Sequence, residues 1–157
     1  ADRGLEEAVA AIGLLGDARV ELHLRGAWQP GFEGRLRDLA ARTGVRPGQL
    51  VVLPPASAAD MVRAAAQFDV GLALEPGVTT NNDIAVSNKI FTYLLAGLAV
   101  VMTRTSGQAA LLPVLGDAAA GCAVRDAASL ADALRPWLDD RQALQRARRT
   151  AWQRAEE

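Results

Sequence analysis

Short apolar runs alternate with amphipathic segments along almost the whole sequence, and this alternation limits the folds that the chain can adopt. Segments of strand length occupy residues 19–26, where apolar and polar residues alternate, and residues 49–55, 69–76, 98–103 and 118–126. Strands that alternate with helices at this spacing are typical of a parallel sheet with helices on both faces. The sequence therefore predicts an α/β fold with a Rossmann-like, doubly wound parallel sheet of about five strands.

The segments between these runs carry the spacing and the end signals of helices. We expect helices over residues 4–15, 32–43, 57–68, 87–96, 107–116, 129–140 and 141–157. Capping pairs start two of them, with Ser57 and Asp60 in one and Ser129 and Asp132 in the other. The segment 77–86, "GVTTNNDIAV", is polar and poor in helix formers, so we predict a loop there.

The sequence opens in a predicted helix, whereas a doubly wound unit normally begins with a strand that becomes a central one. We therefore expect the first strand to lie outside this chain. The sheet would then carry an unpaired gap near its middle, which should weaken it or promote association. A chain of 157 residues is long enough for one core and short for two, so we expect a single domain over residues 1–157.

Composition narrows the classes of partner and compartment. Half of the residues are apolar and 22% are charged, which fits a globular protein rather than a disordered one. The net charge of −1 creates no field that would draw the chain to nucleic acid. No apolar run is long enough to cross a membrane. The single cysteine, Cys122, excludes an internal disulfide and suits a reducing compartment, so we expect a cytoplasmic protein.

Lys89 is the only lysine in the chain, and it stands in the first turn of the predicted helix 87–96. A cation there costs roughly 0.3–1 kcal/mol against the helix dipole. A bound phosphate would turn this cost into a gain, because helix N-termini offer free N–H groups at the edge of the sheet where ligands bind. Arg3 stands in the same arrangement at the first helix, so the pair suggests one diphosphate. The alternative is that Lys89 is an ordinary solvated surface residue.

Three stretches carry a resemblance to a known family: "SNKIFTYLLAGLAVVMT" at 87–103, "TSGQAALL" at 105–112 and "RGLEEAVAAI" at 3–12. Taken in chain order, they resemble the donor-binding part of retaining glycosyltransferases of family 4, whose fold is GT-B. The family segment that corresponds to residues 87–103 typically reads P-x-K-[LI]-F-E-Y-[ML]-A-A-G-x-P-V-V. The intervening blocks are similar as well, so the resemblance covers nearly the whole chain. It implies the C-terminal half of a two-domain, hexosyltransferase-type enzyme that uses a nucleotide-diphosphate sugar, retains the anomeric configuration and needs no metal or other cofactor.

The resemblance also assigns expected positions around the donor. It implies that Lys89 and Arg3 bind the diphosphate and that Leu53 lies near the base through backbone groups. Thr92 stands where the family usually has the glutamate that holds the ribose. A hydroxyl can still bind a ribose, although a charged acceptor forms a hydrogen bond roughly twice as strong. Ala99 replaces the usual proline of the segment.

A second group of residues is expected in the vicinity of the donor sugar. These residues are Glu75, Asn82, Asp83, Ser87 and Asn88, with Gly107 and Gln108 on the far wall of the cleft. The earlier glutamate of the family's paired motif would fall at Ile84, beside Asn82 and Asp83. Glu75 could face the sugar or start a turn before Pro76, and the turn is the more common role for such a residue.

The remaining chemistry-bearing residues do not form a recognisable site. His23 is the only histidine and lies inside a predicted strand, and Cys122 lies among small residues typical of a core. One histidine and one cysteine make no zinc set. The sequence has no phosphate-binding glycine loop and no nucleophile elbow, so we assign no catalytic residue.

The acceptor and the N-terminal domain would lie outside this chain. The helix 141–157 would lead back toward that domain, although its basic side could also touch anionic lipid in the full-length protein. We expect weak nucleotide binding and no sugar transfer from this chain alone. Two alternatives remain open. One is a non-catalytic α/β interaction module with a degenerate nucleotide site. The other is a nucleotide-sugar epimerase, which would need several acid–base side chains in the cleft.

Overall fold

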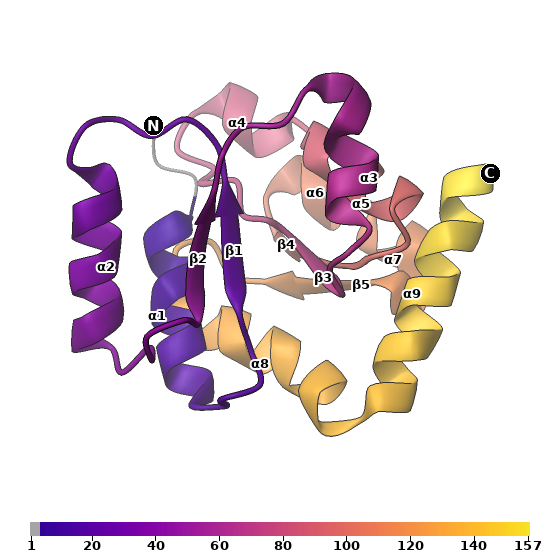
Figure 1. Ribbon diagram of the computed structural model, residues 1–157. Coiled ribbons are helices and arrows are strands. Elements are labelled where there is room, and N and C mark those ends of the chain that lie inside the picture. The colour runs from indigo at the N-terminus through magenta and orange to yellow at the C-terminus, as the bar shows by residue number, and fades with distance from the viewer. Residues whose placement is uncertain (1–3) are drawn as a thin grey trace.

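The computed structural model describes residues 4–157, and its strands are all parallel. β1 (Leu22–Arg25) pairs with β2 (Leu50–Leu53) in one sheet. β3 (Val70–Ala73), β4 (Ala99–Thr103) and β5 (Ala119–Cys122) form a second sheet in that order. Helices follow or connect the strands throughout, so the predicted α/β fold with parallel strands is confirmed (Figure 1).

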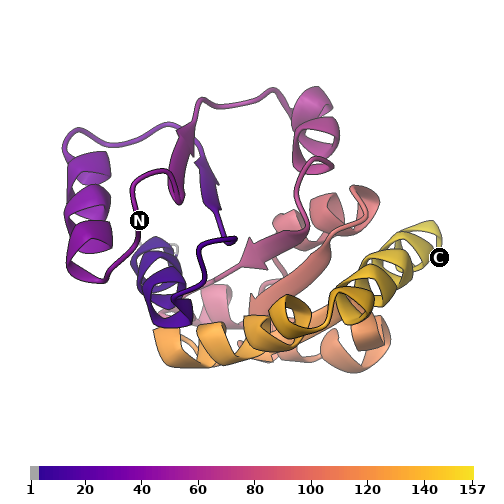
Figure 2. The ribbon, with the colours of Figure 1, turned by 60° about the horizontal axis from the view of Figure 1, so that its bottom comes forward.

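The α-helices between residues 4 and 157 are α1 (Leu5–Leu15), α2 (Phe32–Arg42), α3 (Met61–Ala65), α4 (Thr80–Ile84), α5 (Asn88–Leu95), α6 (Ser106–Ala109), α7 (Leu112–Leu115), α8 (Ala127–Asp139) and α9 (Arg141–Glu156). Helices α1 and α8 cover one face of the second sheet, and α5 and α9 cover the other. Two short 3₁₀ turns cover Ala58–Asp60 and Gly116–Ala118. Figure 2 shows α8 running beneath the sheet toward α9, with α1 beside it.

β4 lies at the centre of the second sheet, and its side chains divide between two cores. Val101 packs into the core built around α1 and α8. Val100 and Met102 point the other way, into the core built around α5 and α9. All residues of β4 are buried, as expected for a parallel strand that is covered on both faces.

The two sheets are not joined by ladder hydrogen bonds. Within residues 4–157, β1 pairs only with β2 and β3 pairs only with β4, so the expected gap in the middle of the sheet is present. Val70 and Leu72 on β3 are only half-buried, unlike the residues of β4. His23 of β1 contacts Phe68, which precedes β3, with ring centroids 4.9 Å apart.

The polar segment 77–86 differs from its prediction, because α4 forms within it. Thr79 has an extended backbone, and its hydroxyl accepts a hydrogen bond from the backbone N–H of Asn82. This N-cap satisfies a free donor of the first turn, which compensates for the poor helix propensity of the asparagines that follow. The loop prediction for this segment was therefore wrong.

Two further helix predictions were wrong in detail. The helix expected over 107–116 is split into α6 and α7, because Pro113 has no N–H to continue the hydrogen bonding of α6. The helix expected to start at Ser129 begins at Ala127, since Asp126 is the N-cap and accepts the N–H of Ser129 at 2.9 Å. The Ser57 cap is confirmed, but it starts a 3₁₀ turn before α3.

Within residues 4–157, no helix combines the length and the apolar composition that a membrane span requires.

Candidate functional site at the carboxyl edge of the sheet

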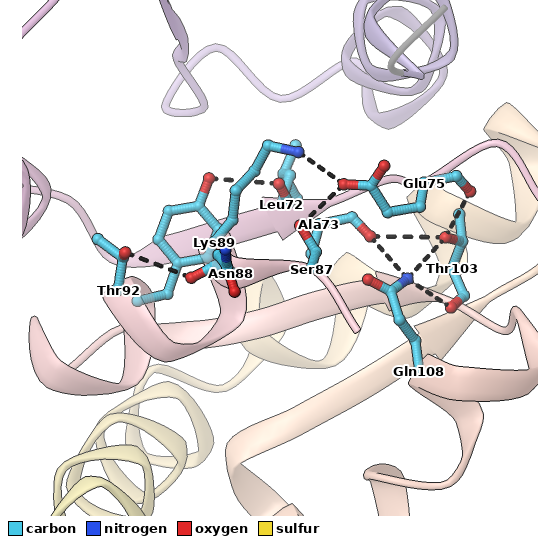
Figure 3. A network of polar contacts seen from close by, with 10 residues as sticks. Leu72, Ala73, Glu75, Ser87, Asn88, Lys89, Thr92, Thr103 and Gln108 are labelled. Atoms are coloured by element: carbon cyan, nitrogen blue, oxygen red, sulfur yellow. Dashed lines mark hydrogen bonds and ion pairs between the residues drawn. The ribbon is translucent and has the colours of Figure 1, made fainter. Parts of the chain in front are cut away.

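Lys89 lies in the first turn of α5, at the carboxyl edge of the second sheet, as predicted. Its ammonium group is paired: Nζ donates to Oε1 of Glu75 at 2.7 Å (Figure 3). Ser87 is the N-cap of α5, but its side chain makes no capping hydrogen bond. Its hydroxyl instead donates to the same Glu75 oxygen at 2.8 Å. The start of α5 is thus fastened to the end of β3 through one carboxylate.

Glu75 follows β3 by two residues and is the anchor of this arrangement. Its side chain is only 15% exposed, compared with 37% for Lys89. Its backbone carbonyl accepts a hydrogen bond from Oγ1 of Thr103, at the end of β4, at 2.8 Å. Glu75 forms an ion pair with Lys89, a contact that the sequence did not predict, and its expected place near the donor sugar stays a prediction.

Gln108 ties the ends of β3 and β4 together beneath Glu75. The residue is fully buried, and its Nε2 donates to the carbonyl of Ala73 at 3.2 Å and to the carbonyl of Thr103 at 3.0 Å. The same amide also donates to Oγ1 of Thr103 at 3.0 Å. Sequence reasoning placed Gln108 near the site but missed Thr103. The only signal for Thr103 in the sequence was that a polar β-branched residue ends an otherwise apolar strand.

Tyr93 completes the packing around this corner. Its hydroxyl donates to the carbonyl of Leu72 at 3.3 Å. Burial, assisted by the negative charge of Glu75, raises the pKa of Tyr93 to about 12, so the phenol stays protonated at neutral pH. It therefore acts here as a hydrogen-bond donor to the strand.

Thr92 and Leu53 do not contact the Lys89–Glu75 pair through any hydrogen bond or ion pair between described residues. The hydroxyl of Thr92 faces the carbonyl of Asn88, in its own helix, at 3.4 Å (Figure 3). Leu53 closes β2 in the other sheet, and its carbonyl accepts the N–H of Gly26 at 3.3 Å. Leu53, the predicted base position, thus lies in a different sheet from β3, which Glu75 follows. Thr92, the predicted ribose position, is on the same helix as Lys89, but its hydroxyl is directed at its own helix.

Asn82 and Asp83 are engaged in local structure. The carboxylate of Asp83 accepts the N–H of Ser106 at 3.1 Å and its hydroxyl at 2.5 Å, so it holds the first turn of α6. These two hydrogen bonds lower the pKa of Asp83 below its ordinary value. Asn82 accepts a hydrogen bond from the hydroxyl of Thr79. Ile84 is 61% exposed.

Arg3 lies outside the described residues, so its convergence with Lys89 stays a prediction. The start of α1 nevertheless reaches the same edge. Gly4 packs so closely on Leu74, which follows β3, that a Cβ on Gly4 would stand 2.5 Å from the Cβ of Leu74. The φ of Gly4 is 68°, which further favours glycine there. Glu7 of α1 lines a small cavity together with Glu75.

Neither His23 nor Cys122 supplies chemistry at this edge. His23 contacts Glu21 through Nε2 at 2.7 Å and packs on Phe68. Cys122 is buried, and this burial raises the pKa of its thiol to about 11, so the nucleophilic thiolate is scarce at neutral pH. Among residues 4–157, no group of three or more His, Cys, Asp or Glu side chains is arranged to hold a metal ion.

Two solved structures of glycosyltransferases have a similar arrangement of helices and strands. The C-terminal domain of a glycosyl transferase group 1 family protein (LpcC) from Francisella tularensis superposes with a TM-score of 0.76 and 12% identity, over 98% of this chain and 78% of that one. WaaG, a glycosyltransferase involved in lipopolysaccharide biosynthesis, superposes with a TM-score of 0.74 and 18% identity, over 98% of this chain and 39% of that one.

No family model matches the sequence, and no curated protein matches it either. The structural likeness, at these identities, concerns the fold. This chain therefore has the Rossmann-like α/β fold of a C-terminal glycosyltransferase domain.

Proposed function

We propose that this chain is the donor-binding domain of a GT-B glycosyltransferase of family 4, which transfers a sugar from a nucleotide-diphosphate sugar to an acceptor with retention. The observation that carries the proposal is the position of Lys89. Its ammonium stands in the first turn of α5 at the carboxyl edge of the sheet, the edge at which open parallel sheets bind nucleotides. The fold likeness to two glycosyltransferases supports the same assignment.

The physical role of this domain would be to stabilise the leaving group. Departure of the nucleoside diphosphate builds negative charge on the β-phosphate oxygen. Lys89 and the N–H groups that open α5 would bind that charge, with Arg3 and the start of α1 as further donors. In this proposal the electrostatic contribution of these groups takes the place of a divalent cation.

The rest of the proposed donor site would extend along the same edge. Thr92 would bind the ribose and Leu53 would lie near the base, while Ser87 and Asn88 would lie close to the donor sugar. Asn82 and Asp83 would reach the ligand only through the segment that they stabilise, because their side chains are engaged at α4 and α6. In this proposal the acceptor site and the N-terminal domain would lie outside this chain, so we predict nucleotide binding without turnover.

A non-catalytic module with a degenerate nucleotide site is the second candidate. It is favoured by two contacts: Thr92 is turned toward its own helix, and Asp83 is committed to α6. A protein of this class would bind a partner protein through the same fold and would not bind nucleotides.

Calorimetric titration with UDP, GDP and ADP tests the proposal. We expect one of the three to bind the purified chain, and Lys89→Ala to weaken that binding about tenfold or more, which corresponds to roughly 1.4 kcal/mol. Arg135→Ala is the matched control, since Arg135 is also an exposed cation in an ion pair, with Asp132 on α8. If none of the three nucleotides binds, or if both variants lose the same amount of affinity, the proposal is overturned and the non-catalytic module is favoured.

A further inference from the structure

Thr103 is the last residue of β4, and its hydroxyl lies between the buried core of the sheet and the Lys89–Glu75 pair (Figure 3). The residue is only 4% exposed. On the core side, Nε2 of Gln108 donates to Oγ1 of Thr103 at 3.0 Å. On the other side, Oγ1 lies 2.8 Å from the backbone carbonyl of Glu75. The hydroxyl thus joins a buried amide to the residue that contacts Lys89.

The neighbours of Thr103 determine where its hydroxyl proton points. The carbonyls of Ala73 and Thr103 can only accept hydrogen bonds, so the Gln108 amide must turn its nitrogen toward them. Because this nitrogen also donates to Oγ1, the single hydroxyl proton is left for a carbonyl. The carbonyl of Glu75 lies at 2.8 Å and that of Ala73 at 3.5 Å, so the main hydrogen bond from Thr103 goes to Glu75.

This hydrogen bond holds the chain beyond the end of the β-ladder. The ladder between β3 and β4 ends at the pair Ala73 and Met102, two residues before Glu75. Thr103 therefore ties the backbone of Glu75 to β4, the strand that is buried along its whole length. The side chain of Glu75 in turn accepts from Nζ of Lys89 at 2.7 Å. Successive hydrogen bonds thus run from the core of the sheet to the ammonium.

An ammonium that is already held in place binds a ligand more tightly than one that must first be ordered. A lysine side chain has much rotamer freedom to lose, and the ion pair with Glu75 removes part of this freedom from Lys89 beforehand. The contact with Glu75 uses one of the three N–H donors of the ammonium, so donors remain for a phosphate.

We propose that Thr103 is a positioning residue for the diphosphate site. Its hydroxyl fixes the backbone of Glu75, and Glu75 holds the ammonium of Lys89 at the place where the phosphate binds. The inference rests on the proposed function, because Lys89 is the residue expected to bind the diphosphate. It assigns a role to a residue that touches no ligand itself and acts through its neighbours.

Thr103→Val tests the inference, because valine keeps the β-branched shape and lacks the hydroxyl. The ligand is whichever of UDP, GDP and ADP binds the wild type, and its Kd is measured by calorimetry. We expect Thr103→Val to raise the Kd about threefold to tenfold, and Thr103→Ser, which keeps the hydroxyl, to stay within about twofold of the wild type. If Thr103→Val is too unstable to titrate, Thr103→Ala replaces it, since alanine and serine differ by one oxygen atom.

A double-mutant cycle separates positioning from a purely structural role. In the Lys89→Ala background, Thr103→Val should change the Kd by less than about twofold, because no ammonium remains to be positioned. Thr43→Val is the matched control. The hydroxyl of Thr43 also donates to a backbone carbonyl, that of Leu39 at 2.8 Å, but at the end of α2. This variant should lower the unfolding midpoint without changing the Kd.

The outcomes distinguish this inference from the proposed function. If Lys89→Ala weakens binding and Thr103→Val does not, the inference is overturned and the proposed function stands. An equal loss from Thr103→Val with and without Lys89 would also overturn the inference, because Thr103 would then act on the fold alone. If no nucleotide binds the wild type, or if Lys89→Ala has no effect, the proposed function is overturned and the inference with it.

Discussion

The ring of Tyr93 in α5 lies directly over Gly71 in β3, so close that a Cβ on residue 71 would stand 2.2 Å from Cγ of the ring. The hydroxyl of the same tyrosine donates to the carbonyl of Leu72. Because Lys89 is on the helix that carries Tyr93, this contact helps to fix the height of Lys89 above the sheet. A side chain at position 71 would force α5 away from β3.

Gly71→Ala should destabilise the protein by about 1–3 kcal/mol, the range for overpacking a well-packed core. Urea unfolding followed by circular dichroism measures the loss. Gly34→Ala is the control, since Gly34 lies in α2 with nothing within 4 Å of the added Cβ. That substitution should be neutral or should stabilise by about 0.5–1 kcal/mol, as alanine does in a helix. Equal unfolding midpoints for the two variants would contradict the close contact at Gly71.

Gln108→Leu should also destabilise the protein, for a different reason. The carbonyl of Thr103 would lose this buried donor, and the carbonyl of Ala73 would keep the long hydrogen bond from Oγ1 of Thr103 at 3.5 Å. A buried carbonyl left unsatisfied costs about 1–3 kcal/mol. Thermal unfolding should show a clear fall in Tm. Gln145→Leu on the exposed side of α9 serves as control and should change the stability by about 0.5 kcal/mol at most. A wild-type Tm for Gln108→Leu would show that this amide does not hold the strand ends.

Asp83 should make the stability depend on pH in the acid range. Its pKa is lowered in the folded state by the hydrogen bonds from Ser106, so the folded state binds fewer protons there than the unfolded state. The stabilisation is complete above the ordinary titration of an aspartate, near pH 4, and is lost as the pH falls through the lowered folded value. The difference in Tm between wild type and Asp83→Asn should therefore be largest near pH 6 and shrink toward pH 2. A difference that stays constant over this range would contradict the assignment.

Much of the fold could be predicted because burial leaves a strong pattern in the sequence. Apolar runs predicted β2, β3, β4 and β5, and the alternation of Leu22 and Leu24 with the half-buried His23 and Arg25 predicted β1. Only β4 is buried along its whole length, as expected for a parallel strand covered on both faces. The errors lie where a single residue decides the local structure. Thr79 starts α4 in a segment without helical spacing, and Pro113 ends the hydrogen bonding of α6 inside a segment that has it.

The candidate site could be predicted only in part. Lys89 was visible because one cation in the first turn of an apolar helix is unusual. Its pairing with Glu75 was not, because a contact between residues 14 positions apart depends on how α5 crosses the end of β3. The buried hydrogen bonds of Gln108 and Thr103 were hidden for the same reason, since they join separate strands. The role predicted for Arg3 in binding the diphosphate stays a prediction.

The missing ladder between β1 and β3 would divide the proposed ligand site between two sheets. Lys89, Glu75 and Gln108 belong to the β3–β5 sheet, whereas Leu53 belongs to the β1–β2 sheet. Side-chain packing yields more readily than a hydrogen-bonded ladder, so a small rotation of one sheet against the other would shift the nucleobase end of a ligand bound at the proposed site more than its pyrophosphate end. Under the proposed function, phosphate binding and base selection would thus be mechanically uncoupled in the part of the chain from Gly4 onward.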